Sequence, residues 1–360
     1  MNKKKVVVGM SGGVDSSVAA YLLKEQGYDV VGVTMQIWQE ESEIMQEEHG
    51  GCCGLSAVED ARRVASDLGI PYYVMNFQKE FKSQVIDYFT AEYLKGRTPN
   101  PCIACNRYVK WESLLQRSME IGADFIATGH YARIRNCENG RVTLHTSKTS
   151  DKDQTYALYN LTQDQLRHTL MPDGDYTKDE IRAIAERVGL RVANKPDSQE
   201  ICFIPDHDYA KYIERETNKK IPCGNFVTKD GTVIGHHEGI THYTVGQRKG
   251  LGIAAGHPVF VTGIRPETNE VVIGEGEDVF SQSLTADHLN WMAIEGLDGN
   301  SLRAAAKIRY KHEGALCTVT REKEDLVQVI FDNPVRAVTP GQAVVFYSTE
   351  GDVLGGGTIC

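Results

Sequence analysis

Two hydrophobic patterns alternate along the first 130 residues of the chain. Short apolar runs, typical of strands buried on both faces, are separated by stretches in which apolar residues recur every three or four positions, as on one face of a helix. The expected strands are residues 5–10, 29–36, 71–76 and 122–130, and the expected helices are one that ends at Gln26 and two over residues 56–68 and 80–94. This alternation predicts an α/β fold with a doubly wound parallel sheet covered by helices.

Capping signals mark the starts of two helices. Ser56 and Thr177 are each followed three residues later by a glutamate, which is the arrangement of a capping box. Gly69 and Gly189 stand where the corresponding helices should end. Residues 194–205 then follow as a polar loop that contains prolines.

Beyond about residue 208 the pattern changes to short β-like segments separated by turn residues. The segments are 231–234, 259–264, 270–273, 304–310, 316–321, 326–331 and 343–348. Short strands at regular spacing predict small, mainly β domains. We therefore expect three domains, over residues 1–207, 208–280 and 281–360, of which the last is a β-barrel.

Composition narrows the class of protein. With 360 residues, of which 41% are hydrophobic, the chain is long enough for two or three domains with their own cores. No apolar run approaches the length of a membrane span, and the first strand follows the amino terminus without an apolar leader, so we expect a cytoplasmic protein with no membrane partner. Nine cysteines are too few for a disulfide scaffold and favour thiol, metal or catalytic roles.

The net charge of −10 argues at first against a nucleic-acid partner. Binding to phosphates, however, needs only a local basic surface. Residues 97–152 carry nine lysines and arginines against five acidic residues. A nucleic-acid partner therefore stays open.

The most informative segment is the 11–17 loop, Ser-Gly-Gly-Val-Asp-Ser-Ser, which connects the first expected strand to the first helix. Glycines let backbone amides approach an anion, serines add hydroxyl donors, and the helix dipole favours negative charge at this end. The loop lacks the lysine of a Walker motif. Its order resembles the pyrophosphate loop of ATP pyrophosphatases, which cleave ATP between the α and β phosphates. Because ligands bind at the carboxyl ends of parallel strands, Met35 and Gly129 should converge on the same nucleotide.

A second candidate site contains cysteines. Cys102 and Cys105 form a Cys-x-x-Cys motif in a segment expected to be a proline-stiffened loop. The spacing alone leaves open a redox pair, half a zinc site, iron–sulfur ligands or coincidence. Cys202 is the distant partner that we select, although a cysteine of this kind is also often a small buried apolar residue.

Taken together, the motifs resemble those of bacterial tRNA-specific 2-thiouridylases, the MnmA family, in the same order and over essentially the whole chain. The segments that carry the resemblance are residues 11–17, 98–101, 105–106, 128–132, 152–154, 198–203, 246–252 and 307–310. The resemblance implies an enzyme that uses ATP and Mg²⁺ to replace oxygen by sulfur at C2 of the wobble uridine of tRNA. It also implies a persulfide donor, either a cysteine desulfurase or a sulfur-relay protein.

The resemblance further implies roles for single residues. Cys202 would carry the persulfide and Cys105 would be the partner nucleophile. The implied ATP ligands are Gly9, Met10, Ser11, Gly12, Gly13, Val14, Asp15, Ser16, Met35 and Gly129. The implied contacts to the target base are Asn100, Pro101 and Cys102, and those to the rest of the tRNA are His130, Lys152, Asp153, Gln154, Arg309, Tyr310 and Gln342.

Cys102 departs from the family pattern, because many members have aspartate at this position. A thiol with an ordinary pKa is a poor substitute for a carboxylate at neutral pH. Cys102 could instead join Cys105 and Cys202 as the third ligand of an iron–sulfur cluster.

Other interpretations remain open. Lys307, Arg309 and Lys311 alternate as on one face of a strand, which suits either an RNA backbone or a solvated sheet face. An ATP pyrophosphatase acting on a small amine would need the 11–17 loop and neither Cys105 nor Cys202. A non-enzymatic RNA-binding protein with a cluster or zinc would tolerate changes in the loop. Sequence also cannot separate direct attack by the persulfide from attack by released hydrosulfide.

Overall fold

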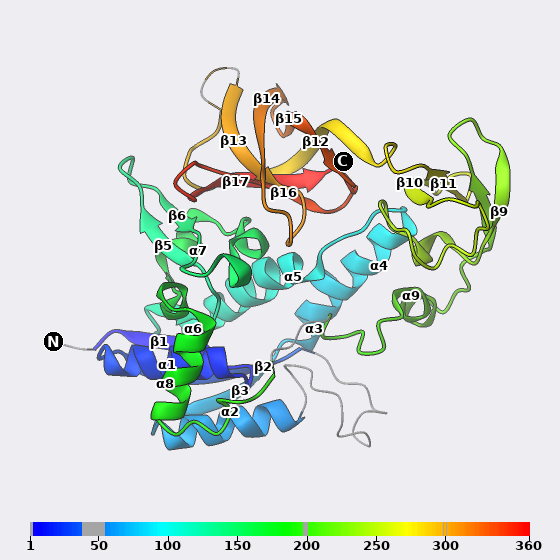
Figure 1. The fold of residues 1–360 in the computed structure, drawn as a ribbon. Coiled ribbons are helices and arrows are strands. Elements are labelled where there is room, and N and C mark those ends of the chain that lie inside the picture. The colour runs from blue at the N-terminus through cyan, green and yellow to red at the C-terminus, as the bar shows by residue number, and fades with distance from the viewer. Residues whose placement is uncertain (1–2, 38–54, 197–200, 298, 300) are drawn as a thin grey trace. The chain divides into compact units, whose positions relative to one another are not determined.

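The computed structural model describes residues 3–37, 55–196, 201–297, 299 and 301–360 (Figure 1). The chain separates into two compact units. The first unit comprises Met1–Val85, Cys102–Pro205 and Gly351–Val353, and the second comprises Ile86–Pro101, Asp206–Glu350 and Leu354–Cys360. Within the described residues, no helix is both long enough and apolar enough to cross a bilayer.

The first unit is built on a five-stranded parallel sheet, as the sequence predicted. Its strand order is β3-β2-β1-β4-β7. The bounds are β1 Lys5–Gly9, β2 Asp29–Gln36, β3 Tyr72–Asn76, β4 Phe125–Ala127 and β7 Thr169–Leu170. The chain moves outward from β1 to β3 on one side and from β4 to β7 on the other, so the order reverses between β1 and β4. In open α/β sheets, ligands bind at the carboxyl ends of the strands at such a reversal.

The first unit also contains helices, some of which contact the sheet directly whereas others pack on neighbouring helices or on a hairpin. They are α1 Val14–Glu25, α2 Leu55–Asp67, α3 Gln78–Phe81, α5 Pro101–Ala104, α6 Leu115–Glu120, α7 Gln163–Arg167 and α8 Lys178–Arg187. The α8 capping box is confirmed, since the Thr177 hydroxyl accepts from the Glu180 amide and the Glu180 carboxylate accepts from the Thr177 amide. The expectation for Ser56 is wrong, because α2 already begins at Leu55 and Ser56 lies inside it. A hairpin of β5 Arg133–Asn136 and β6 Val142–His145 completes the unit.

The Cys-x-x-Cys segment is helical, which corrects the loop expected from its two prolines. Pro101 is the first residue of α5, and a π-helical segment, Cys105–Leu114, continues directly from it. Proline is well suited to the first helical position, because its missing N–H has no partner there in any case. Cys102 and Cys105 therefore lie three residues apart on one helix, which places them on the same side.

The helix expected over residues 80–94 is a continuous helical run that crosses from the first unit to the second. It consists of α3, a π-helical turn at Lys82–Ile86, and α4 Asp87–Leu94. The second unit continues with α9 Tyr209–Thr217. A four-stranded sheet then follows in the order β10-β11-β8-β9, with one parallel pair. Its strands are β8 Gly224–Val227, β9 Val233–His237, β10 Phe260–Arg265 and β11 Glu270–Gly274.

The last part of the second unit is a closed six-stranded barrel, as predicted. The order is β12-β15-β14-β13-β16-β17. The bounds are β12 Phe280–Trp291, β13 Ser301–Lys307, β14 Ala315–Lys323, β15 Leu326–Arg336, β16 Ala343–Tyr347 and β17 Val353–Ile359. Alternate residues such as Val319, Phe331 and Phe346 fill its interior.

The expected row of three cations on one strand is wrong. Strand β13 ends at Lys307, and the chain then turns, with the amide of His312 donating to the carbonyl of Arg309. Ile308 is drawn into the barrel core at the start of this turn. Arg309 and Lys311 are therefore turn residues rather than partners of Lys307 on a strand face.

Candidate functional site

The 11–17 loop joins β1 to α1 at the reversal of strand order. Gly12 has φ +69°, and a Cβ there would lie 2.3 Å from the carbonyl oxygen of Ala57, so a side chain would fit neither the backbone nor the space. Gly13 is the N-cap of α1 and supplies no side-chain acceptor for the first turn. Amide groups of that turn have no partner within the helix and can bind an anion.

Serine hydroxyls hold the loop closed. The Ser17 hydroxyl donates to the carbonyl of Gly13 at 2.7 Å, and the Ser16 hydroxyl accepts from the amide of Ser11 at 3.1 Å. Ser16 and Ser17 are themselves buried. These contacts fix the loop before any ligand is present, and such preorganisation lowers the cost of binding.

Gly129 and Met35 lie at the same edge of the sheet as the loop. Gly129 follows β4, and a Cβ on it would lie 2.5 Å from the amide nitrogen of Ser16. Met35 is the penultimate residue of β2, two positions beyond Val33, whose carbonyl accepts from the amide of Met10. The structure thus brings together three segments that are far apart in the sequence.

Asp15, in the first turn of α1, is the centre of a polar cluster. Its carboxylate accepts from the Tyr131 hydroxyl at 2.6 Å and from the Lys178 ammonium at 2.7 and 2.8 Å. Lys178 is the first residue of α8, so the capping box fixes its backbone. Its ammonium also lies 5.9 Å from the centre of the Tyr131 ring.

Asp173 adds a second carboxyl group to this cluster. It is fully buried, and among the described residues neither of its oxygens receives a hydrogen bond. Burial raises the pKa of the Asp173 carboxyl well above its usual range, the negative charge of Asp15 adds to the rise, and Lys178 opposes it.

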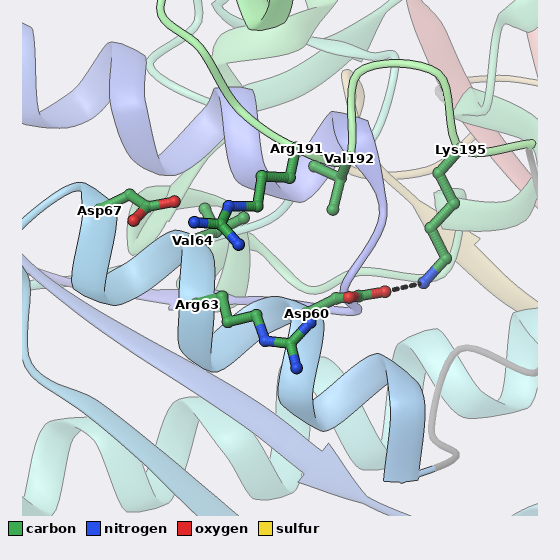
Figure 2. Close-up of a pocket in the computed structure, with 7 residues that line it drawn as sticks. All are labelled: Asp60, Arg63, Val64, Asp67, Arg191, Val192 and Lys195. Carbon is green, nitrogen blue, oxygen red and sulfur yellow. Dashed lines mark hydrogen bonds and ion pairs between the residues drawn. The ribbon is translucent and has the colours of Figure 1, made fainter.

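Lys195 braces the loop from another direction. Its ammonium donates to the carbonyl of Gly12 at 3.1 Å and to the Asp60 carboxylate at 2.7 Å, as Figure 2 shows for the second contact. The pair lies at one end of a cavity of about 210 Å³ between α2 and residues 191–195. The cavity is lined by Asp60, Arg63, Val64, Asp67, Arg191, Val192 and Lys195.

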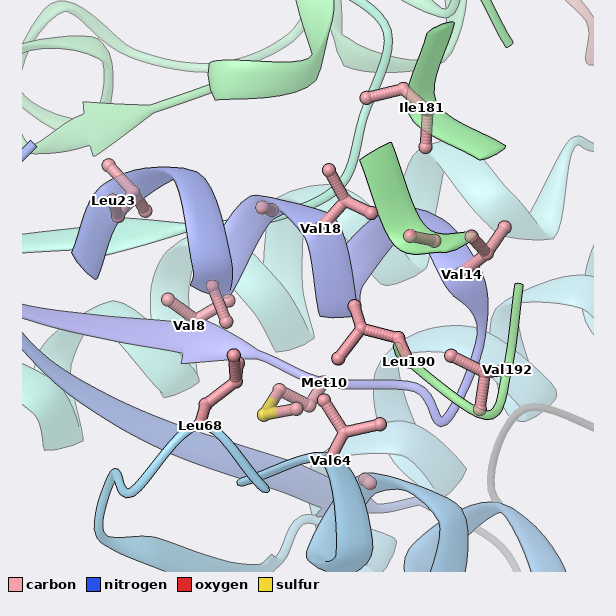
Figure 3. Close-up of a cluster of buried hydrophobic side chains, with 14 of the residues drawn as sticks. Val8, Met10, Val14, Val18, Leu23, Val64, Leu68, Ile181, Leu190 and Val192 are labelled. Atoms are coloured by element: carbon pink, nitrogen blue, oxygen red, sulfur yellow. The ribbon is translucent and has the colours of Figure 1, made fainter. Parts of the chain in front are cut away.

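Apolar residues anchor both ends of the loop. Met10 before it and Val14 after it are almost fully buried and belong to one hydrophobic cluster with Val64, Leu190 and Val192 (Figure 3). This cluster joins α1, α2 and the segment after α8. The backbone amides between Met10 and Val14 are therefore held on a packed core.

His130 is half-buried. Lys110 donates to its Nε2 at 3.4 Å, so Nδ1 carries the proton and donates to the Thr128 hydroxyl at 2.7 Å. Burial, and then the charge of Lys110, lowers the pKa of His130 well below its usual range. The imidazole is therefore neutral at physiological pH, and its predicted contact with RNA stays a prediction.

The predicted RNA-binding segment 152–154 is connected by hydrogen bonds to residues near the 11–17 loop. The buried Asp153 carboxylate accepts from the amide of Ser147 and the hydroxyl of Thr155. The Gln154 side chain accepts from the amide of Tyr131, whose hydroxyl reaches Asp15. Asp153 and Gln154 therefore organise the backbone here, and Lys152 beside them is half-buried.

Cys105 and Cys202 both belong to the first unit. Cys102 is exposed, whereas Cys105 and Cys202 are half-buried. Cys202 precedes Phe203, which is buried. The ring of Phe203 packs edge-on against that of Phe81, with 5.6 Å between the ring centroids. Among the described residues, no group of three or more His, Cys, Asp or Glu is arranged to hold a metal ion, so the iron–sulfur alternative stays a prediction. Residues 198–200 of the motif before Cys202 lie outside the described residues.

The second unit holds the remaining predicted RNA contacts. Gln342 donates to the carbonyl of Thr98 at 2.7 Å, so it lies beside the segment that contains Asn100 and Pro101. Arg309 donates to the carbonyl of Arg336, and Tyr310 is 39% exposed. The structure thus joins Gln342 to the segment that is predicted to contact the base, and these RNA contacts stay predictions.

Sequence reasoning missed four residues of the site: Tyr131 (as a partner of Asp15), Asp173, Lys178 and Lys195. Lys178 lies 163 positions from Asp15, and Lys195 lies 183 positions from Gly12. The only available signal was the capping box that contains Lys178, and that box predicts a helix start and not a ligand.

Comparison with known proteins gives matches over almost the whole chain. Residues 4–206 match the family described as tRNA methyl transferase HUP domain, residues 210–275 the tRNA methyl transferase PRC-barrel domain, and residues 281–359 the Aminomethyltransferase beta-barrel domain.

Full-length relatives are named more specifically. The chain is 67% identical over 357 residues to the tRNA-specific 2-thiouridylase MnmA of Lachnoclostridium phytofermentans, and the match covers 99% of each of the two chains. It is 59% identical over 359 residues to that of Clostridium perfringens, covering 100% of this chain and 99% of the relative. It is 55% identical over 357 residues to that of Clostridioides difficile, covering 99% and 98%.

Proposed function

The chain belongs to the MnmA family of tRNA-specific 2-thiouridylases and is a tRNA 2-thiouridylase, and on that premise we propose how its residues divide the reaction. The 11–17 loop binds ATP for adenylation of the C2 oxygen of the wobble uridine. Cys202 carries the sulfur as a persulfide, and Cys105 is the partner thiol. The products are 2-thiouridine, AMP and diphosphate.

Activation is needed because the C2 oxygen of uridine belongs to a urea-like carbonyl and leaves very poorly. Attack of this oxygen on the α phosphate forms the O–P bond and breaks the α–β bond, which releases diphosphate. The oxygen can then leave as part of AMP. A site for this step must hold the diphosphate portion of ATP firmly and stabilise the charge that develops on it.

The observation that carries the ATP proposal is the N-terminus of α1. Gly13 leaves the first-turn amides without a side-chain partner, and Gly12 has a left-handed backbone without a Cβ. Asp15 presents a carboxylate in that turn, which fits Mg²⁺, since this ion is usually held by one or two carboxylates together with substrate phosphates. When bound, Mg²⁺ would neutralise phosphate charge, and Asp15 is the residue that would hold it.

Sulfur transfer uses the two cysteines of the first unit. The terminal sulfur of the Cys202 persulfide attacks C2, and AMP leaves. The Cys105 thiolate then attacks Sγ of Cys202, which breaks the persulfide S–S bond, leaves the sulfur on the base and forms a Cys105–Cys202 disulfide. An external thiol reductant reopens this disulfide. In the alternative order, Cys105 cleaves the persulfide first and released hydrosulfide attacks the base.

The rest of the chain is assigned to the tRNA. We assign residues 1–207 to ATP and sulfur chemistry, residues 208–280 to a small central domain, and residues 281–360 to a barrel that contacts tRNA. Asn100, Pro101 and Cys102 face the target base in this assignment. A cysteine desulfurase or a sulfur-relay protein loads Cys202, and the reaction takes place in the cytoplasm, where the tRNA is.

Reconstitution tests the proposal. The purified chain is incubated with tRNA that lacks the modification, ATP, Mg²⁺, a cysteine desulfurase and cysteine, and the nucleosides are analysed by mass spectrometry. We expect 2-thiouridine at the wobble position together with AMP. Cys202→Ser should abolish the product, whereas Cys223→Ser, which changes an exposed cysteine of the second unit, should not. Equal activity of Cys202→Ser and the wild type would contradict the assignment.

A further inference from the structure

We propose that Lys178 is the phosphate-binding cation that the 11–17 loop itself lacks, and that it exchanges the Asp15 carboxylate for the β and γ phosphates when ATP binds. This inference rests on the proposed binding of ATP at the loop and adds a residue to that site. Walker loops carry such a lysine within the loop, but this chain would supply it from the start of α8.

The position of Lys178 fits this role. Its ammonium lies within 2.8 Å of both oxygens of Asp15. Asp15 is in the first turn of α1, the turn whose amides we assign to the phosphates of ATP. Its side chain is 12% exposed, so little water surrounds the charge and a phosphate contact would be strong there. The capping box at Thr177 and Glu180 fixes the backbone from which it reaches.

Asp15 explains why Lys178 would change partner. One Asp15 oxygen already accepts from both Tyr131 and Lys178, and the other accepts from Lys178. Asp15 cannot give the same lone pairs to Lys178 and to Mg²⁺, and the two cations repel each other. If Asp15 held the metal ion, Lys178 would therefore turn to the phosphates.

Asp173 is a second and independent observation at the same place. A structural ion pair with Lys178 needs one carboxylate, and Asp15 supplies it. Asp173 is nevertheless fully buried beside the pair, with neither oxygen receiving a hydrogen bond from any described residue. Burying a carboxyl group without a hydrogen-bond partner costs free energy, so its presence indicates a ligand-binding site rather than ordinary hydrophobic core.

Titration calorimetry with the full-length chain and Mg²⁺ tests the proposal, with ATP, inorganic pyrophosphate and AMP as separate probes. Lys178→Met should weaken binding of ATP and pyrophosphate by about 10- to 100-fold, as expected for one charge-assisted contact, and leave AMP binding unchanged. Lys148→Met is the matched control. It removes a half-exposed lysine that pairs with Glu180 of the same helix start, and such surface pairs contribute little.

Removal of Lys178 would also leave the Asp15 carboxylate and the buried Asp173 carboxyl without the Lys178 charge, which could unfold the site. The double variant Lys178→Met with Asp173→Asn also removes the second carboxyl group. It should regain the wild-type melting temperature and still bind pyrophosphate weakly. Wild-type affinity for pyrophosphate in either variant would overturn the proposal. Equal losses for pyrophosphate and AMP in the double variant would also overturn it, because Lys178 would then only shape the site. Failure of the wild type itself to bind ATP would contradict the proposed function and this inference with it.

Discussion

Gly129 approaches the first turn of α1 closely, and adding one methyl group at this position tests the arrangement of the site. In Gly129→Ala the new Cβ would lie 2.5 Å from the amide nitrogen of Ser16 and 2.6 Å from the carbonyl carbon of Asp15. Both contacts are with backbone, so no flexible side chain can swing aside. The two segments must separate by about half an ångström to bring these contacts even to 3.0 Å.

Such overpacking typically costs about 1 to 3 kcal/mol. Here the methyl group also covers the Ser16 amide, which we assign to the anion site. If the strain displaces the first-turn amides from their positions for binding phosphate, the affinity for ATP decreases by about 10- to 100-fold. A smaller part of the cost should appear as a lower melting temperature of the ligand-free chain.

The assay is ATP binding by calorimetry, with thermal unfolding measured in parallel. Gly263→Ala, in a strand of the other unit, is the control, because among the described residues its Cβ would meet only Val272, at 3.7 Å. We expect the control to match the wild type in ATP binding. Wild-type ATP affinity in Gly129→Ala would refute the placement of Gly129 against an ATP-binding helix terminus.

Three further predictions concern the same unit. Asp15→Asn should weaken adenylation, measured as AMP release that depends on tRNA, because a neutral amide holds Mg²⁺ less well; unchanged ATP turnover would remove Asp15 from the site. Thr177→Ala should lower the free energy of unfolding by about 1 kcal/mol in urea titrations through loss of the α8 cap, and no loss would show that the box is not needed. Because burial raises the pKa of Asp173 above its ordinary value of 3.8, its ionised form destabilises the fold as pH rises. Asp173→Asn should therefore stabilise the chain at pH 7 to 8 and have little effect below the ordinary carboxyl pKa, and a pH-independent difference would contradict that cause.

The periodic parts of the fold were predictable from the sequence. Apolar runs such as residues 5–10 and 29–36 form strands of the parallel sheet. A strand that is covered on both faces needs apolar residues at nearly every position, so such runs identify it. The barrel was also predictable from its regular short segments, although β12 and β17 were missed. Strand β17, Val353–Ile359, contains three consecutive glycines and therefore carries little β signal.

Predictions failed where one residue or a distant contact decides the structure. The prolines before Cys102 predict a loop, yet Pro101 starts a helix because it occupies the first helical position. The cation row ended at Lys307 because Ile308 turns into the barrel core. The partners of Asp15 could not be predicted, since a contact across 163 residues leaves no local pattern.

The central claim is that ATP activates the base and that Cys202 delivers the sulfur. A single-turnover experiment tests it most directly. The chain is loaded with sulfur by a cysteine desulfurase and freed of donor, and the persulfide is located by peptide mass spectrometry before and after addition of tRNA, ATP and Mg²⁺. The account predicts an extra sulfur on Cys202 that disappears only when ATP and tRNA are both present, with one 2-thiouridine formed for each sulfur lost. Loss of that sulfur without ATP, or thiolation by a Cys202→Ser chain under the same conditions, would contradict it.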